Sequence, residues 1–242
     1  MARADLRAAW EEHAAEWTRW ARTPGHDSYW QFHRDLFVEL LPPPGRRTLD
    51  LGCGEGRLGR HLKTFGHRVV GVDASPTLVA AAAEADPTSE VQVANAAELP
   101  FADAAFDLVV AFMSLQDVDE LEAAVHETAR VLEPGGRLCL AIVHPVNSAG
   151  LFEGREPGSR FVIDGSYLAV SFYADELERD GLTMTFTSAH RPLESYVEAL
   201  ASSGFLIERL REPAVPEAAI EQPSVRRWQR LPLFLHMRAL KR

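Results

Sequence analysis

The chain has 242 residues, of which 46% are hydrophobic, and a formal net charge of −10. A chain of this length and composition can bury the core of one large domain, so a second domain is not required. The negative charge disfavours a nucleic-acid partner, because neutralising phosphates requires a basic face. The basic stretch 226–242 departs from this balance, and we interpret it as a solvated last helix and strand end.

Cysteine usage and apolar content indicate a cytoplasmic protein. Cys53 and Cys139 are too few and too differently placed for a disulfide framework, so both are expected to be reduced thiols. No stretch approaches the roughly 20 apolar residues that cross a bilayer, and the first 13 residues lack the apolar middle of a signal peptide. We therefore predict no membrane partner, and the choice between monomer and homodimer stays open.

Two helices are expected before the main fold. Over residues 3–22, hydrophobic side chains recur at three- and four-residue spacing, which is typical of a helix, and Pro24 follows its end. A second helix is expected from residue 27 or 28 to the prolines at 42–44.

From residue 48 the pattern changes to short apolar runs that alternate with helical segments. The runs are rich in Val, Ile and Leu at consecutive positions, which indicates strands buried on both faces of a parallel sheet. We therefore predict a doubly wound α/β domain. The expected strands are RTLDLG (47–52), HRVVGVD (67–73), VQVAN (91–95), FDLVVAFM (106–113), GRLCLAIVH (136–144), GFLIERL (204–210) and PLFLHMRAL (232–240), and the expected helices are 57–65, 76–85, 120–132 and 192–203.

The alternation breaks after residue 144, where the sequence predicts an inserted cap of β-strands. Leu182, Met184 and Phe186 alternate with threonines, and this period of two is typical of a strand. We therefore divide a single domain into an N-terminal segment, a first core part, a cap and a returning core part. These parts are residues 1–45, 46–144, 145–190 and 191–242.

A glycine turn follows the first predicted strand. DLGCGEG at 50–56 has glycines at alternate positions, and glycine occurs where a backbone takes positive φ or lets a ligand approach closely. Asp73 ends the second strand, where an acidic residue can bind ribose hydroxyls, so the pair predicts a nucleoside ligand. The spacing differs from the dinucleotide fingerprint, and Glu55 would put a negative charge beside a pyrophosphate. A ligand without phosphate is favoured.

These motifs resemble those of one known family, the class I S-adenosylmethionine-dependent methyltransferases, over residues 48–240. LDLGCGEG, VVGVDAS, ANAAELPF and FDLVVAFMSLQDV are similar to its first four motifs in order, and VLEPGGRL is similar to the turn before its fifth strand. Within this family, the sequence is most similar in type to the small-molecule methyltransferases related to ubiquinone-biosynthesis enzymes. The resemblance implies a Rossmann-like, mostly parallel sheet of seven strands with the last one antiparallel, N-terminal helices and a β-rich cap insert.

The resemblance also implies the cofactor, S-adenosylmethionine, and its binding residues. Asp50, Gly52 and Gly54 are expected to line the methionine portion, and Asp73 is expected to hold the ribose hydroxyls. Asn95 stands where the family often has Asp, but an amide oxygen can still accept a hydrogen bond from the adenine amine. The expected cofactor-binding residues are Asp50, Gly52, Cys53, Gly54, Gly56, Asp73, Ala74, Ser75, Asn95, Ala96, Ala97, Phe112, Met113 and Ser114.

The N-terminal segment and the cap are expected to form a lid over the acceptor. In the family, elements before the first strand often fold over the cofactor, and such lids exclude water and position the acceptor. The aromatic side chains of this segment favour a flat or apolar acceptor, although we interpret Trp10 as a core anchor. The residues expected to contact the substrate are Trp20, Tyr29, Trp30, His33, Gln116 and His144.

A catalytic base is required only if the nucleophile arrives protonated, because transfer of an activated methyl group needs mainly alignment. His144 leaves the fifth strand on the ligand side and titrates in the useful range, so we rank it first, ahead of His190 and Tyr167 near the cap. No metal-ligand motif or nucleophile elbow is evident, so no metal is expected.

The predicted function is methyl transfer from S-adenosylmethionine to O, N or C of a small-molecule metabolite. Methylation of RNA or of a protein is an alternative. The acidic charge disfavours RNA, as does AFMSLQD at 111–117, which stands in place of the N/D-P-P-Y/F sequence of enzymes that methylate exocyclic amines. A nicotinamide oxidoreductase and a non-catalytic S-adenosylmethionine-binding protein are further alternatives.

Overall fold

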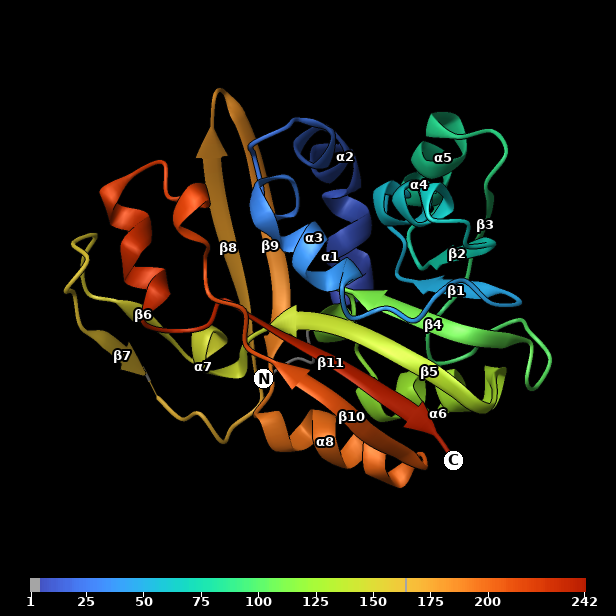
Figure 1. The fold of residues 1–242 in the computed structure, drawn as a ribbon. Coiled ribbons are helices and arrows are strands. Elements are labelled where there is room, and N and C mark those ends of the chain that lie inside the picture. The colour runs from blue at the N-terminus through green and yellow to red at the C-terminus, as the bar shows by residue number, and fades with distance from the viewer. Residues whose placement is uncertain (1–4, 164) are drawn as a thin grey trace.

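The computed structural model describes residues 5–163 and 165–242. Its main sheet consists of β1 (Thr48–Leu51), β2 (Val69–Asp73), β3 (Glu90–Val93), β4 (Phe106–Phe112), β5 (Leu132–Val143), β10 (Phe205–Arg211) and β11 (Phe234–Lys241). The order is β10-β11-β5-β4-β1-β2-β3 (Figure 1). Neighbouring strands from β3 to β5 are parallel, whereas β11 is antiparallel to both β5 and β10. The predicted Rossmann-like sheet with an antiparallel last strand is confirmed.

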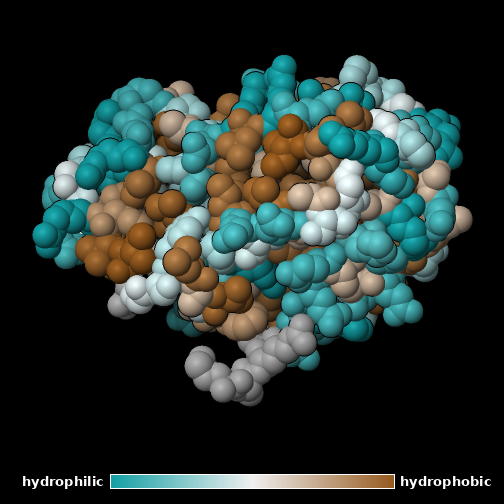
Figure 2. All heavy atoms as spheres, turned by 90° about the horizontal axis from the view of Figure 1, so that it is seen from below, coloured by the Kyte–Doolittle hydropathy of each residue, from teal (hydrophilic) through white to brown (hydrophobic). Residues whose placement is uncertain are grey.

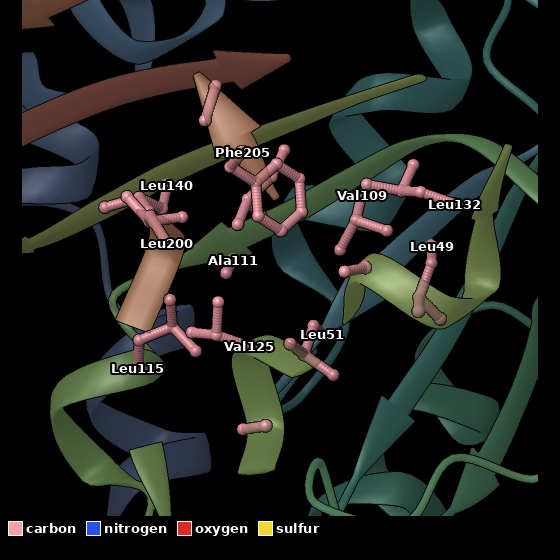
Figure 3. Packing of buried hydrophobic residues seen from close by; sticks show 14 of the residues in the cluster. Leu49, Leu51, Val109, Ala111, Leu115, Val125, Leu132, Leu140, Leu200 and Phe205 are labelled. Carbon is pink, nitrogen blue, oxygen red and sulfur yellow. The ribbon is translucent and has the colours of Figure 1, made fainter. Parts of the chain in front are cut away.

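Helices cover both faces of this sheet, as expected for strands that are apolar on both sides. These helices are α3 (Arg34–Val38), α4 (Arg57–Thr64), α5 (Pro76–Ala85), α6 (Leu121–Val131) and α8 (Leu193–Ser202). Along β4, Val109 and Ala111 pack in one buried cluster with residues of α6 and α8 (Figure 3). Leu108 and Val110 pack in a second cluster with residues of α3 and α4. Successive side chains of a strand point to opposite faces, so β4 contributes to the core on both sides.

The N-terminal segment is divided differently from the prediction. In place of one helix over residues 3–22 there are two, α1 (Leu6–Glu12) and α2 (Ala14–Arg22), and residues 1–4 lie outside the described part. The helices meet at His13, which has φ −96° and ψ 7°. At the start of α1 the N–H of Leu6 donates to the carboxylate of Asp119, whereas α2 packs against α5 and the cap. Because of the bend, α1 and α2 can each make different contacts. Hydrophobic periodicity alone does not predict such a bend.

The second expected helix begins with a π-helical turn. This turn, η1 (Tyr29–His33), continues directly into α3, which ends before Pro42. π-helical turns are rare and are found frequently at functional sites. Both Tyr29 and His33 are buried, and both line the main cavity of the protein.

Two antiparallel hairpins form the cap, so its predicted β-rich character is confirmed. The first pairs β6 (Gly150–Phe152) with β7 (Phe161–Ile163), and the second pairs β8 (Ser171–Arg179) with β9 (Leu182–His190). The short helix α7 (Pro145–Ser148) leads into the cap. Between β10 and β11 lie two 3-10 turns, η3 (Glu217–Ala219) and η4 (Pro223–Gln229). Phe186 of β9 packs edge-to-face against Trp17 and Trp20 of α2, which joins the cap to the N-terminal segment.

The cap leaves many large side chains in contact with solvent. Every residue of β8 except Tyr173 is exposed. Leu151, Leu168 and Val170 are exposed as well, and apolar atoms gather on the cap side of the molecule when it is seen from below (Figure 2). Few buried contacts are typical of elements with low local stability, from which lids are drawn.

Candidate active site

A large cavity lies at the carboxyl ends of β1, β2 and β4. Its volume is about 1120 Å³, and α2, η1 and the β8–β9 hairpin wall it on the side away from the sheet. Ligands of open α/β sheets bind at this edge. Because a single small-molecule site usually occupies roughly 300–1,000 Å³, the cavity has room for a cofactor and a second molecule.

The glycine turn forms the floor of the cavity. Gly52 and Gly54 line it with φ of +73° and +55°, values that side chains rarely adopt. A Cβ on Gly52 would lie 2.4 Å from the Cβ of Ser114, and one on Gly54 would lie 3.3 Å from Nε1 of Trp17. Gly56, with φ +82°, is outside the cavity lining and precedes α4. The expected role in ligand approach therefore fits Gly52 and Gly54, whereas Gly56 serves the turn into the helix.

Replacing Gly52 by alanine should lower the free energy of unfolding by about 2–5 kcal/mol, from left-handed strain of about 1–2 kcal/mol and overpacking of about 1–3 kcal/mol. Urea denaturation measures this loss. Gly25→Ala is the matched control, since Gly25 has φ +83° and no neighbour within 4 Å of the added Cβ. Gly25→Ala should lower the free energy of unfolding by the strain alone. Equal losses of this free energy in the two variants would contradict the predicted clash with Ser114.

Asp73 stands beside the glycine turn at the end of β2. Its Oδ2 accepts a hydrogen bond from the N–H of Gly54 at 2.8 Å, and its Oδ1 accepts one from the N–H of Ser75 at 2.9 Å. The backbone of Ala74 also hydrogen-bonds to this carboxylate. A carboxylate offers about four acceptor sites, so acceptor capacity remains for a ligand hydroxyl such as that of a ribose.

Carboxyl groups that line the cavity give it a preference for positive charge. Burial, and secondly the charge of Asp73, raises the pKa of Asp50 to about 7. Burial also raises the pKa of Asp73 and brings that of Asp117 to about 8. A cation near these groups would favour their ionised forms, whereas a pyrophosphate would repel them. The cavity therefore suits a cationic nucleoside cofactor such as S-adenosylmethionine, which carries a sulfonium.

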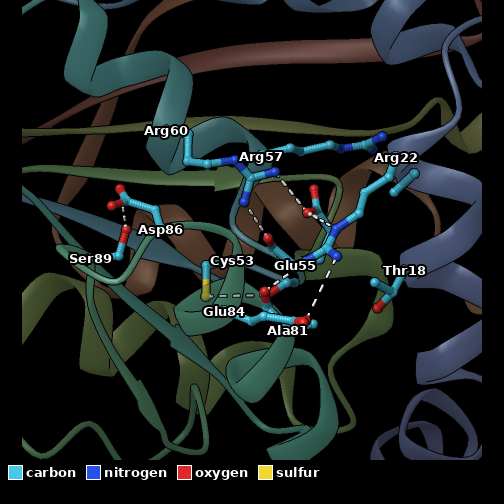
Figure 4. A network of polar contacts seen from close by, with 12 residues as sticks. Thr18, Arg22, Cys53, Glu55, Arg57, Arg60, Ala81, Glu84, Asp86 and Ser89 are labelled. Atoms are coloured by element: carbon cyan, nitrogen blue, oxygen red, sulfur yellow. Dashed lines mark hydrogen bonds and ion pairs between the residues drawn. The ribbon is translucent and has the colours of Figure 1, made fainter.

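Glu55 has a different role from the predicted one, which was to repel a pyrophosphate. It is buried and lies 3.2 Å from Nε of Arg22 and 2.7 Å from Nη2 of Arg60 (Figure 4). Its charge is therefore compensated by two guanidinium groups and does not act as a free anion against phosphate. The preference for a phosphate-free ligand rests on Asp50 and Asp73. Glu55 instead ties α2 to the glycine turn.

The residues expected beside adenine lie at the ends of β2 and β3. Ala74, Ser75, Asn95 and Ala96 line the cavity, whereas Ala97 does not. The side-chain oxygen of Asn95 accepts a hydrogen bond from the N–H of Ala97 at 3.0 Å, which holds the amide in place. Because a carbonyl oxygen has a second lone pair, it can still accept one from a ligand amine.

The end of β4 forms a side wall. Phe112, Met113 and Ser114 all line the cavity, and Met113 has φ +57°, which bends the chain there. The hydroxyl of Ser114 donates to the carbonyl of Leu51 at 2.6 Å and so holds this wall against β1. Phe112 also packs in the core cluster with α3 and α4, so it serves both the core and the cavity.

Cys53 also lines the cavity, and its thiol is buried. Burial raises the pKa of this thiol well above its usual range. Cys139 is buried too, and both cysteines are free thiols, as expected. A neutral thiol packed against β2 makes Cys53 an apolar wall residue.

Four of the six expected substrate residues line the cavity, namely Trp20, Tyr29, His33 and Gln116. Trp30 does not. It packs edge-to-face on Tyr29, and its Nε1 donates to the carbonyl of Ala21 at 2.6 Å. Within the described residues, the buried Nε1 of Trp20 and Oε1 of Gln116 have no hydrogen-bond partner, so a ligand could satisfy both.

The three expected base candidates lie outside the cavity lining. Nδ1 of His144 accepts from the N–H of Val146, and its Nε2 lies 2.8 Å from the carboxylate of Glu212. Nδ1 of His190 lies 2.7 Å from Oγ of Ser148, and its Nε2 lies 2.9 Å from the carbonyl of Tyr167. Both nitrogens of each imidazole are therefore already engaged within the protein.

The hydroxyl of Tyr167, the third candidate, accepts from the N–H of Leu193 at 3.1 Å. His144 is the N-cap residue of α7, so it ends the strand structurally and does not face the cavity. The position of His144 therefore does not support its expected role as proton acceptor. It does not support the expected contact with the substrate either.

The sequence prediction missed a polar cluster on the cavity wall. Asp117 follows Gln116 in the 3-10 turn η2 (Leu115–Asp117), and its Oδ1 accepts from the hydroxyl of Ser188 in β9 at 2.5 Å. Tyr173 of β8 hydrogen-bonds to Ser188 as well, and all three line the cavity. The period of two in β9 could have placed Ser188 on the same face as Phe186. Nothing in the sequence showed that Asp117 meets this strand.

A second missed group joins the glycine turn to the N-terminal segment. The guanidinium of Arg57 lies 4.7 Å from the ring centre of Trp17 and 4.3 Å from that of Tyr29, and it pairs with Asp27 at 2.6 Å. Trp10 packs edge-to-face on Trp17 and lines the cavity, so it is more than a core anchor.

The fold and this cavity define an α/β protein with a site for a nucleoside cofactor. The sequence pattern of a family described as "Methyltransferase domain" matches residues 49–140. A crystal structure of an S-adenosylmethionine-dependent methyltransferase from Mesorhizobium loti matches with a TM-score of 0.72 and 25% identity, over 89% of this chain and 98% of that one. Residues 49–140 therefore form a methyltransferase domain, and the fold is that of the class I S-adenosylmethionine-dependent methyltransferases.

Curated relatives match over a shorter span. O-methyltransferase resE of Aspergillus sclerotiorum is 34% identical over 140 residues, which are 54% of this chain and 50% of the relative. A demethylmenaquinone methyltransferase of Beutenbergia cavernae is 37% identical over 117 residues, 48% of each chain. The chain thus spans about half the length of these curated relatives.

This domain implies S-adenosylmethionine as the cofactor, and the residues present fit it. Gly52 leaves the space that a close ligand needs, Asp73 keeps acceptor capacity, and Asp50 favours a cation. Across the described residues, no three His, Cys, Asp or Glu side chains are grouped so that they could hold a metal ion. A search of the same residues finds no helix with the length and apolar character needed to cross a membrane.

Proposed function

We propose that the protein transfers a methyl group from S-adenosylmethionine to O, N or C of a small, flat or apolar molecule. The observation that carries this proposal is Asp73, whose carboxylate is held by backbone N–H groups and keeps acceptor capacity beside the glycine turn. The cavity has room beyond the cofactor, and aromatic rings of α2 and η1 line the additional space. This combination supports an enzyme with a small second substrate.

The roles of the binding residues follow from their positions. Asp73 binds the ribose hydroxyls, Asn95 and Ala96 meet the adenine, and Asp50 with Gly52 and Gly54 lines the methionine portion. The cofactor supplies a methyl group that the sulfonium has already activated. The protein therefore has to hold, align and shield the reactants, and we assign the shielding to residues 1–45 and 145–190 acting as a lid.

Asp117 is the proton acceptor that the geometry supports best. An acceptor hydroxyl or ammonium has to lose a proton, and a carboxylate with a pKa near the working pH is suited to take it. Asp117 lines the cavity, and Ser188 and Gln116 hold it through hydrogen bonds at 2.5 and 3.2 Å. Its enclosure accounts for the pKa of about 8. The proton moves from the acceptor to the carboxylate of Asp117.

The experiment that tests the proposed function has two stages. Isothermal titration with S-adenosylhomocysteine should show micromolar binding at one site per chain. A panel of flat phenols and aromatic amines is then incubated with S-adenosylmethionine, and release of S-adenosylhomocysteine is measured. Absence of binding would contradict the cofactor site, whereas binding without turnover on any acceptor would favour a non-catalytic binding protein.

A further inference from the structure

The cavity has a second charged wall that is formed far along the chain. Arg227 and Trp228 of η4 line it together with Phe152 of β6. In Figure 1 the orange-red helical segment that contains η4 lies with β6 and β7, and the β8–β9 hairpin separates this group from β2 and α5. This wall therefore lies across the cavity from the glycine turn.

Within residues 5–163 and 165–242, Arg227 has no counterion. Its Nη1 donates to the carbonyl of Ser224 at 2.8 Å, and it makes no ion pair with any residue in 5–163 or 165–242. Its Nε is buried and, within the same residues, has no hydrogen-bond partner. The adjacent Arg226 differs, because both of its terminal nitrogens bond the carboxylate of Glu217.

An unpaired, partly desolvated guanidinium is costly. Burial, and secondly the charge of Arg155, lowers the pKa of Arg227 from its usual range. A buried N–H without a partner loses its hydration without compensation. Structural arginines normally avoid this cost by pairing with a carboxylate, so an anion from outside the chain would remove it here.

Aromatic rings hold the guanidinium and shape the space beside it. Phe152 and Trp228 meet edge-to-face with ring centres 4.8 Å apart and an interplanar angle of 86°. The guanidinium carbon of Arg227 lies 5.5 Å from the ring centre of Phe152 and 5.6 Å from that of Trp228. Such contacts hold the cation in place. The fixed fork of arginine matches the two oxygens of a carboxylate, and the rings offer surfaces to a flat apolar molecule.

The opposite wall has the opposite charge. Asp50, Asp73 and Asp117 surround the end of the cavity where the cofactor and the reacting atom are placed. An anionic group is repelled there and attracted at Arg227, so the two walls would orient an acceptor that has charge at one end only.

We infer that the acceptor is a flat, apolar molecule bearing a carboxylate, which Arg227 binds between Phe152 and Trp228 while the group to be methylated faces Asp117. The inference rests on the proposed function and specifies the substrate class for the same cavity. Arg227 acts in it as a specificity-determining residue.

The test uses two nearly isosteric probes, the anion 2-naphthoate and the neutral 2-naphthamide. Isothermal titration of the full chain saturated with S-adenosylhomocysteine gives a dissociation constant for each. The wild-type protein should bind the carboxylate about ten- to hundredfold more tightly, as a charge-assisted hydrogen bond implies. Arg227→Gln should bring this ratio close to one, and Arg227→Lys, which keeps the charge but loses the fork, should give an intermediate ratio.

Arg226→Gln is the matched control, because it removes the same charge one position earlier from a side chain that already has a carboxylate partner. It should leave the ratio at its wild-type value. Equal affinities for the two probes in the wild-type protein, or an unchanged ratio in Arg227→Gln, would overturn the inference. Binding of S-adenosylhomocysteine is measured separately in each variant, so loss of the anion preference is distinguishable from failure of the cofactor site.

Discussion

Replacement of Asp73 by alanine should raise the dissociation constant for S-adenosylhomocysteine by at least about 100-fold. Each hydrogen bond from a ribose hydroxyl to the carboxylate contributes about 1.5–3 kcal/mol, and two of them correspond to two or more orders of magnitude in affinity. The substitution also frees the N–H of Gly54, which Asp73 holds at 2.8 Å, so the glycine turn loses part of its preorganisation. Isothermal titration measures the effect.

Asp103→Ala serves as the control for this prediction. Asp103 is exposed and pairs with Arg130 at 2.9 Å, outside the cavity lining. This variant should bind S-adenosylhomocysteine as the wild-type protein does. A loss of less than about tenfold in Asp73→Ala, with the fold intact by circular dichroism, would show that the ribose hydroxyls are held elsewhere.

Asp117→Asn should lower turnover of any hydroxyl or amine acceptor by about 10²–10⁴-fold, the usual contribution of a positioned base. The wild-type rate should rise with pH up to the pKa of about 8, because only the ionised carboxylate can take the proton. The variant should lose this rise. Initial rates across pH 6 to 9 report both effects, and Asp175→Asn, which changes another carboxyl on the cavity wall, should keep the wild-type profile.

The same substitution should change how stability depends on pH. The pKa of Asp117 is raised in the folded protein, so the folded state binds a proton that the unfolded state has released above about pH 4. The contribution of Asp117 to the free energy of unfolding is fully present below about pH 4. It decreases as pH rises toward 8, by about 1.4 kcal/mol per pH unit. Thermal unfolding of the free protein should therefore depend less on pH in Asp117→Asn. An unchanged dependence would contradict the raised pKa.

The sequence was sufficient to predict the sheet and the residues that meet at the glycine-turn end of the cavity, because both depend on local patterns. Runs that are apolar on both faces specify parallel strands, and the ends of parallel strands meet at one edge, so the glycine turn and Asp73 had to be neighbours. Other strands end at the same edge, and the residues at their ends also line the cavity in the structure. These residues are Asn95, Phe112, Met113 and Ser114.

The acceptor end could not be predicted in the same way, because long-range packing brings it together. Asp117 meets Ser188 across 71 positions of the chain, and Phe152 meets Trp228 across a similar distance. Strand periodicity predicts which side chains share a face, but it does not predict against which elements a hairpin packs. The sequence alone does not distinguish Arg226 from Arg227. The structure shows a carboxylate partner for Arg226 and, among the residues it describes, none for Arg227.

His144 illustrates a local signal that could have been used. The next residue is Pro145, which occupies the first position of α7, and proline is favoured at the first helical position. A residue directly before such a proline is the N-cap, where its side chain bonds the helix backbone. The dipeptide His-Pro therefore indicated a capping histidine, with its ring turned toward α7.

The pairing of Glu55 with Arg22 and Arg60 sets a limit on how the protein can be recombined with its relatives. A chimera that exchanges the first 45 residues would keep Glu55 in its buried place but would lose Arg22 unless the donor supplies an arginine there. Glu55 would then keep Arg60 but lose one of its two compensating charges, in the turn that the cofactor has to approach. Exchange of the first 45 residues therefore requires a donor that has an arginine at this position.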